Sequence, residues 1–370
     1  MSERPHLGGI ESLRGYAALS IVVFHVIFLA GFQPPENLAV LSAHLGRGVP
    51  LFFVVSAFSL AYGYFGRLDG DAERREFYVR RLFRIAPLYY LAVFFQLAVH
   101  HPWNWILIHP WETVLNLFFL FNLAPEKVEG IALASWSIGV EMLFYAVLPV
   151  VLFLVRGLRG AAIFAIASFV AAVAQMAVLG GLPGGPPAFV QHGFLFNLPY
   201  FAFGLLAYFL WRERSERQWP LALIASLVGM AALVALVGPY VFTPIGNGVY
   251  QTLWAIPFSL LCLALAWRDA PVISWWGTRF LGRISFSLYL AHPHVIDWLG
   301  RFGVYARIKG LEGGPAVTFP AASLATIGVL IPVAWLLFSF VETPGIALGR
   351  GLVARLRASK PSGALSPEIG

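Results

Sequence analysis

Two ionisable side chains, Arg14 and His25, stand in the first long apolar segment of the chain. If that segment is helical, their spacing of eleven residues places them on one face, about 16 Å apart along the axis, at about 1.5 Å and about 100° per residue. Ionisable groups are costly inside a membrane and usually serve function there. We predict that Arg14 holds an anionic group, whereas His25 acts as a base near neutral pH. The alternative is a membrane-end arginine and a packed structural histidine.

Two further arginines, Arg81 and Arg84, lie one helical turn apart in the segment Phe77–Pro87. Such a pair can clamp phosphate groups through charge-assisted hydrogen bonds. The alternative is an ordinary topogenic charge cluster that contacts lipid headgroups. We predict that Arg81 and Arg84, together with Arg14, bind a phosphate-bearing substrate.

A glutamate, Glu141, enters a later apolar segment after Trp136 and Ser137. We expect it at about the depth of His25, where a carboxylate can orient an imidazole or stabilise its charged form. The alternative is a structural carboxylate paired with another helix. Ser137, Trp136 and Tyr145 are predicted to contact the substrate.

A second histidine, His292, lies seven residues after Ser285, so the two share a helix face. His292 is a further candidate for substrate binding, with a structural histidine as the alternative. The single cysteine, Cys262, lies in an apolar run and cannot form an internal disulfide. We expect it to pack as a small hydrophobic residue, and we predict no metal site.

The elements that must position these residues are membrane helices. The 370-residue chain is 59% hydrophobic and only 12% charged, with a mean hydropathy of +0.76. Globular proteins carry about 25% charged residues, and a bilayer crossing needs about 20 apolar residues. The sequence therefore predicts an all-α, polytopic helical bundle with ten spans, near residues 12–31, 49–66, 85–100, 137–155, 161–179, 193–211, 219–237, 249–267, 283–300 and 318–340.

The distribution of basic residues sets the predicted topology. Ten spans place 20 basic residues inside and 5 outside, whereas an additional crossing at 111–123 gives 12 against 13. The positive-inside rule favours ten spans in the cytoplasmic membrane, with both termini cytoplasmic and 111–123 re-entrant or interfacial. Arg301, Arg307 and Lys309 run against this rule. The short basic loops leave no face that could bind nucleic acid, despite a net charge of +7.

We expect one membrane domain, residues 1–345, followed by a basic, disordered cytoplasmic tail, residues 346–370. The expected partners of the protein are the lipid bilayer and a small or polymeric substrate. Without further information the ionisable residues fit either an enzyme or a proton-coupled transporter or flippase of a polar substrate. Binding of an activated, phosphate-bearing donor would favour the enzyme.

The order of the motifs resembles that of the acyltransferase 3 family, polytopic membrane O-acyltransferases. Glu11–Gly15 followed by His25 resembles the opening Arg-x10-His motif, and five later segments resemble the others in sequence: Gly48–Ser56, Arg81 to Ile85, Trp136–Glu141 with Phe144 and Tyr145, Leu281–His292, and Phe340–Pro344. Met142 and Leu143 depart from a polar pair that often follows the glutamate, and Ala57 replaces a usual glycine. These departures are expected to affect how the acceptor fits.

The resemblance implies transfer of an acyl group, usually acetyl, from cytoplasmic acyl-CoA to a hydroxyl of a carbohydrate or glycosylated acceptor. It also implies importance for Arg14, His25 and Glu141, and donor binding by Arg81 and Arg84. Either general-base transfer or an acyl-histidine intermediate fits these residues. Some relatives carry a fused hydrolase-like domain outside the membrane, so a separate esterase-like partner is expected here.

Overall fold

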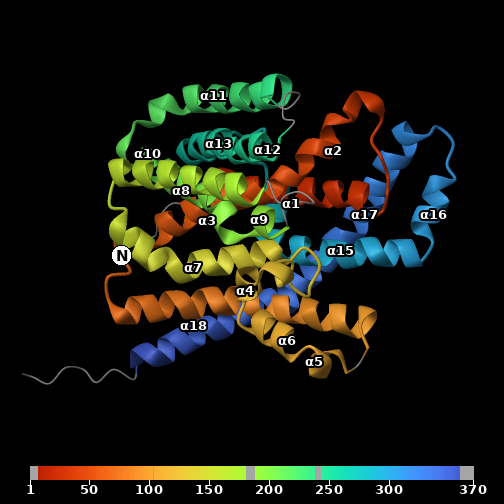
Figure 1. Cartoon of the computed structure of the whole chain (residues 1–370), viewed down its shortest axis with the longest axis horizontal. Helices are drawn as coiled ribbons and strands as arrows, with labels where there is room; N and C mark the ends of the chain where they lie inside the picture. The colour runs from red at the N-terminus through yellow and green to blue at the C-terminus, as the bar shows by residue number, and fades with distance from the viewer. Residues whose placement is uncertain (1–6, 103, 181–187, 238–242, 359–370) are drawn as a thin grey trace, which may run out of the picture.

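The computed structural model describes residues 7–102, 104–180, 188–237 and 243–358. Within these ranges the regular elements are helices, and no strand is present. Figure 1 shows the long helices running roughly side by side between α11 (Trp219–Ala232) at the top and α18 (Thr343–Ala358) at the bottom of the view. The predicted all-α class is confirmed.

Nine helical segments of the described chain are long and apolar enough to cross a bilayer. They match nine of the ten predicted spans, and the chain is a multi-pass membrane protein. These segments contain α1 (Gly8–Phe28), α3 (Gly48–Tyr64), α4 (Asp71–His100), α7 (Trp136–Leu154), α8 (Leu158–Leu179), α10 (Phe194–Glu213), α11, the pair α12 (Pro244–Leu253) and α13 (Ala255–Trp267), and α17 (Pro315–Leu337).

The tenth predicted span corresponds to α15 (Ser285–Arg301), which follows α14 (Trp276–Arg283) after a break at Ile284. α15 has 17 residues, at the lower end of the roughly 17–25 that cross a bilayer. It packs against α1 and α17 within the bundle. The stretch 111–123 holds α6 (Pro110–Leu117) and a 3-10 turn, which are too short to cross, as predicted.

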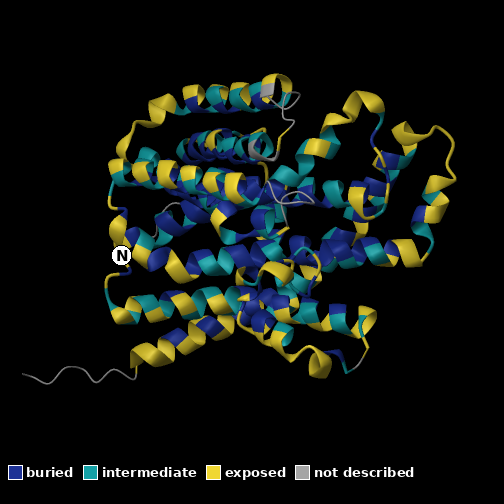
Figure 2. Ribbon diagram, in the orientation of Figure 1, coloured by how far each residue is buried: buried dark blue, intermediate teal, exposed yellow. Residues whose placement is uncertain are grey.

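The outer helices carry apolar stripes that face away from the bundle. On α11, Leu221, Ile224 and Val228 are 68%, 59% and 62% exposed, and their spacing of three and four residues places them on one face. Figure 2 shows exposed positions recurring along one side of this helix. These stripes are the surfaces expected to contact lipid.

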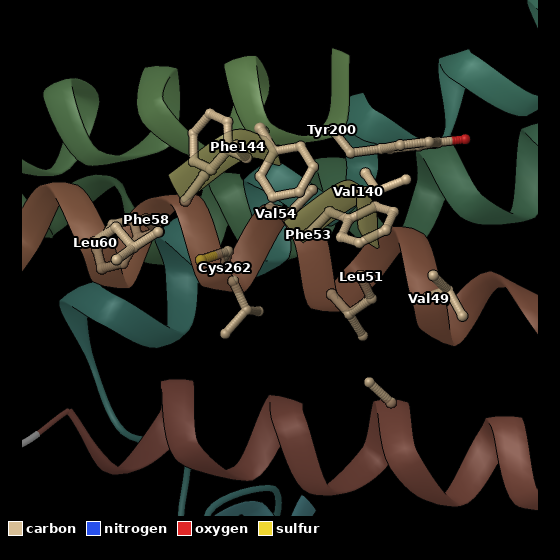
Figure 3. Close-up of a cluster of buried hydrophobic side chains, with 14 of the residues drawn as sticks. Val49, Leu51, Phe53, Val54, Phe58, Leu60, Val140, Phe144, Tyr200 and Cys262 are labelled. Carbon is tan, nitrogen blue, oxygen red and sulfur yellow. The ribbon is translucent and has the colours of Figure 1, made fainter. Parts of the chain in front are cut away.

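The interior contains a tightly packed cluster of apolar side chains from α3, α7, α10 and α13 (Figure 3). Phe201 stacks on both Phe53 and Phe144, with ring centroids 4.7 and 4.1 Å apart. Cys262 is fully buried in this cluster, as expected of a small hydrophobic residue.

Two glycines bring α1 against α14, directly before α15 begins. A Cβ atom at Gly282 would overlap the carbonyl oxygen of Glu11, and one at Gly15 would lie 2.6 Å from the carbonyl oxygen of Thr278. Only glycine permits such a close approach of two helix backbones. This contact sets the position of α15 along α1, and therefore decides which residues of the two helices meet.

The predicted disordered tail is wrong for residues 346–358. These residues extend α18, which packs on α4 and whose Arg357 pairs with Glu76. Gly345 and Gly349 permit this packing, because a Cβ atom at either would lie 2.7 Å from a side-chain atom of α4. Residues 359–370 lie outside the described part of the chain.

Candidate active site

A narrow cavity of about 70 Å³ lies in the middle of the bundle, between α1, α3, α4, α7 and α15. We call it the inner cavity. Charged and hydroxyl-bearing side chains line much of it: Arg14, Ser56, Arg81, Arg84, Ser137, Glu141, Tyr145, Ser285 and Tyr289. Ionisable groups gathered inside a membrane bundle are characteristic of a substrate or ion pathway.

A wider cavity of about 530 Å³ adjoins the inner cavity at the end of the bundle where α1 begins. We call it the basal cavity. The two share Arg14, Ser56, Arg81 and Arg84, so the same side chains face both spaces. The basal cavity is also lined by Arg283 and by two acidic residues, Glu11 and Glu342. A polar substrate can therefore enter from this end and extend a thin arm into the inner cavity.

Arg81 is held between aromatic rings in a way that aims its charge into these cavities. Its guanidinium donates a hydrogen bond of 3.0 Å to the hydroxyl of Tyr64 and lies 5.1 Å from the Tyr64 ring centroid and 5.8 Å from that of Tyr145. Its Nε atom is buried with no hydrogen-bond partner among the described residues. An unpaired buried donor of a cation is suited to an anionic ligand such as a phosphate.

Glu141 projects into the inner cavity from α7. Its Oε1 accepts hydrogen bonds of 2.6 Å from Ser56 of α3 and from Tyr145, one turn later on α7. The carboxylate also lies within electrostatic range of Arg14 and Arg81. Glu141 is therefore a partner of the basic side chains in the cavity, and its negative charge offsets part of theirs.

His25 of α1 meets His292 of α15. The Nδ1 atom of His25 lies 3.0 Å from Nε2 of His292 and 2.9 Å from the carbonyl oxygen of Ile21. The Nδ1 atom of His292 lies 2.5 Å from the carbonyl oxygen of Tyr289. The contact between the two rings joins positions 267 residues apart in the sequence.

The partners of the two histidines assign their tautomers. Carbonyl oxygens only accept hydrogen bonds, so the Nδ1 atom of each ring carries a proton. The Nε2 atom of His292 is then an acceptor, and it receives the Nδ1 proton of His25. In the neutral ring of His25, Nε2 is then unprotonated, and it makes no hydrogen bond within the described residues. It is the basic atom of the pair.

Tyr289 lies between the inner cavity and the histidine pair. Its hydroxyl donates to the carbonyl oxygen of Ala134 at 2.6 Å and accepts from Ser137 at 2.7 Å. Its ring lines the inner cavity and lies 5.6 Å from the ring of His292. Tyr289 therefore separates the inner cavity from the histidine pair, and neither histidine lines that cavity.

The structure brings together most of the residues selected from the sequence. Six line the inner cavity, namely Arg14, Arg81, Arg84, Ser137, Glu141 and Tyr145. His292 contacts His25 directly. The hydrogen bonds of Glu141 and His25 lead to different partners, so the expected pairing of these two residues is absent from the described contacts. Trp136 stacks on His192, with centroids 4.2 Å apart, and packs against Phe53.

Three residues of the site were missed from the sequence: Ser56, Tyr64 and Tyr289. Tyr289 could have been found, because it is one turn before His292 and one turn after Ser285, on the same helix face. Ser56 and Tyr64 belong to an apolar helix whose polar positions show no pattern that a sequence alone can assign. Within the described residues no cluster of three or more His, Cys, Asp or Glu side chains is placed to hold a metal ion.

Comparison with known proteins identifies the family of the chain. The sequence profile of the acyltransferase 3 family, described as an acyltransferase domain, matches residues 7–338. A protein of Acidianus two-tailed virus named as an acetyltransferase is 24% identical over 327 residues, which cover 84% of this chain and 89% of that protein. The acyltransferase MdmB of Streptomyces mycarofaciens is 27% identical over 377 residues, 92% of each chain.

A third relative is YrhL of Bacillus subtilis (strain 168), named as a peptidoglycan O-acetyltransferase. It is 25% identical over 342 residues, which cover 79% of this chain and 49% of YrhL. The chain therefore spans about half the length of this relative. No solved structure matches the chain.

Proposed function

The chain belongs to the acyltransferase 3 family and is an acyltransferase, and on that premise we propose that it transfers an acyl group, acetyl in the first place, from acyl-CoA to a carbohydrate hydroxyl. One observation carries the proposal. The inner and basal cavities share three arginines, and Tyr289 on the wall of the inner cavity lies next to His292, the partner of His25. We further propose that the basal cavity faces the cytoplasm, with both termini on that side of the cytoplasmic membrane.

The dimensions of the two cavities suit the two parts of acyl-CoA. The basal cavity is wide enough for a nucleotide and presents Arg14, Arg81 and Arg84 to its phosphates. The inner cavity is narrow, as a pantetheine arm requires. The separation of Arg14 and His25 along α1, about 16 Å, is comparable with the length of that arm.

His25 is the proposed catalytic base. Its Nε2 atom takes the proton of the acceptor hydroxyl as the hydroxyl oxygen forms a bond to the thioester carbonyl carbon. The carbon–sulfur bond then breaks, and the proton passes to the leaving CoA thiolate. The products are an ester and CoA with a free thiol. An acyl-histidine intermediate, in which Nε2 first attacks the thioester, uses the same atom and stays an alternative.

His292 has the part that the sequence suggested for Glu141. When His25 gains a proton, its Nδ1–H bond strengthens toward Nε2 of His292 and the carbonyl oxygen of Ile21, which hold the ring in one orientation. His292 is therefore a positioning residue. Glu141 is assigned to the donor side, where its charge and its bonds to Ser56 and Tyr145 fix the basic wall of the inner cavity.

A carbohydrate acceptor is supported by the name of YrhL, which specifies O-acetylation of peptidoglycan. Acetyl as the acyl group is supported by the same name and by that of the viral relative. The expectation of a separate esterase-like partner outside the membrane stays a prediction.

The proposal is tested with purified protein in lipid nanodiscs, acetyl-CoA labelled in the acetyl group, and envelope carbohydrate as acceptor. His25→Ala is expected to abolish labelling of the carbohydrate. His109→Ala is the matched control, because His109 is exposed and outside the lining of the described cavities. Undiminished labelling by a folded His25→Ala variant would rule out both the general-base and the acyl-histidine forms of the mechanism.

A further inference from the structure

A third cavity, of about 670 Å³, lies beyond the histidine pair, at the end of the bundle where α1 terminates. We call it the distal cavity. Leu29 and Ile296 contribute to its wall, and each lies one helical turn beyond a histidine of the pair, Leu29 after His25 and Ile296 after His292. The distal cavity therefore approaches the histidines from the side opposite the basal cavity.

The polar side chains of the distal cavity carry a surplus of positive charge. Asp297 is paired with Arg301 at 2.8 Å and lies 3.6 Å from His100. Lys309, at the end of α16 (Val304–Lys309), packs its amino group 5.2 Å from the ring centroid of Phe32 and has no ion pair within the described residues. Arg301 therefore neutralises Asp297, the one carboxylate that lines the distal cavity, and the positive charge of Lys309 has no counter-charge among the lining residues.

Arg301 and Lys309 are also two of the three residues that run against the positive-inside rule. Basic residues on the outer side oppose the predicted orientation, which the other loops support strongly. Because Lys309 lies on the wall of the distal cavity, it can bind an anion that enters from this side.

We propose that the distal cavity is the acceptor site, and that Lys309, beside the ion pair of Arg301 and Asp297, binds the carboxylate or phosphate of an anionic carbohydrate whose hydroxyl reaches His25. This inference rests on the proposed function, since it assigns the substrate class of the same reaction. The anionic group would orient the sugar ring and select one hydroxyl, while the ring itself fills the apolar part of the cavity. Neutral sugars lack this contact and bind weakly.

The test measures binding of three matched sugars to the protein in nanodiscs by calorimetry. The sugars are methyl glucoside, methyl glucuronide and methyl glucoside 6-phosphate, which differ only at C6. One of the anionic sugars is expected to bind about tenfold more tightly than the neutral one, which corresponds to about 1.4 kcal/mol. The stronger of the two anions identifies the group as a carboxylate or a phosphate.

Three variants locate the preference. Lys309→Gln is expected to reduce the preference for the anionic sugar over the neutral one to less than about threefold. Asp297→Asn is expected to increase this preference, because it removes a carboxylate that repels the anion. Arg307→Gln is the matched control, since Arg307 is a neighbouring basic residue of α16 outside the cavity lining, and it should leave the preference unchanged. Equal binding of all three sugars, or an equal loss in Arg307→Gln, would overturn the proposal.

A fourth variant, His25→Ala, separates this inference from the proposed function. The sugar preference is expected to persist in it while acyl transfer is lost. Transfer that survives in His25→Ala would contradict the proposed mechanism and leave the distal site supported by its binding data. If His25→Ala loses acyl transfer but the wild-type protein binds all three sugars equally, only the proposal for the distal cavity is contradicted.

Discussion

Replacing His292 tests whether one histidine positions the other. His292→Phe keeps a planar ring of similar shape in the buried position but removes the Nε2 acceptor of the His25 Nδ1 proton. A hydrogen bond to a charged group contributes about 1.5–3 kcal/mol, and each 1.36 kcal/mol is about a tenfold change in rate. We therefore expect kcat to fall by about 10- to 150-fold. The KM for acyl-CoA should change little, because His292 is remote from the basal cavity.

The assay is the initial rate of CoA release in nanodiscs at varied acyl-CoA concentration. His292→Gln is the matched control, since its amide oxygen can take the place of Nε2 as acceptor, and it should recover much of the lost rate. Thermal unfolding of each variant shows whether it is folded. A stable His292→Phe protein with the kcat of the wild type, or with only a raised KM, would refute the positioning role.

Three other substitutions test the remaining parts of the site and the packing that forms it. Arg81→Gln is expected to raise the KM for acyl-CoA by about 10-fold or more with little change in kcat, because one charge-assisted contact to phosphate is lost; a change confined to kcat would contradict this. Glu141→Gln keeps an acceptor oxygen for Ser56 and Tyr145 but removes a negative charge that offsets part of the charge of the nearby arginines, so it should lower the KM for the anionic acyl-CoA, whereas a fall in kcat alone would restore the role beside His25 predicted from the sequence. Gly282→Ala should destabilise the protein by about 1–3 kcal/mol in denaturant unfolding, because its Cβ atom would overlap α1; unchanged stability would show that this contact is loose.

The membrane architecture could be predicted closely because apolar run length and basic loops report directly on bilayer crossing. The exceptions have local causes. α4 begins at Asp71, well before the predicted span at 85, because the basic segment continues the same helix beyond the apolar run. α18 was missed because its stability comes from glycine-mediated contact with α4, which composition does not reveal.

The basic half of the site could also be predicted, since Arg14, Arg81 and Arg84 are unusual in such a sequence. The pairing of His25 with His292 could not. The pairing depends on how far α15 is displaced along α1. That displacement is set by the contact of α1 with α14, the helix before α15, at Gly15 and Gly282. Glu141 was expected to meet His25, whereas its described hydrogen bonds lead to Ser56 and Tyr145, because depth in a helix does not say which helix a side chain faces.

The most direct test of the central claim is a cryo-electron microscopy structure of the protein in nanodiscs with a non-hydrolysable thioether analogue of acetyl-CoA. We expect the phosphates beside Arg81 and Arg84, and the carbon that replaces the carbonyl within about 6 Å of the Nε2 atom of His25, which leaves room for the acceptor hydroxyl between them. An analogue whose arm ends outside the inner cavity, or whose reactive carbon lies far from His25, would contradict it.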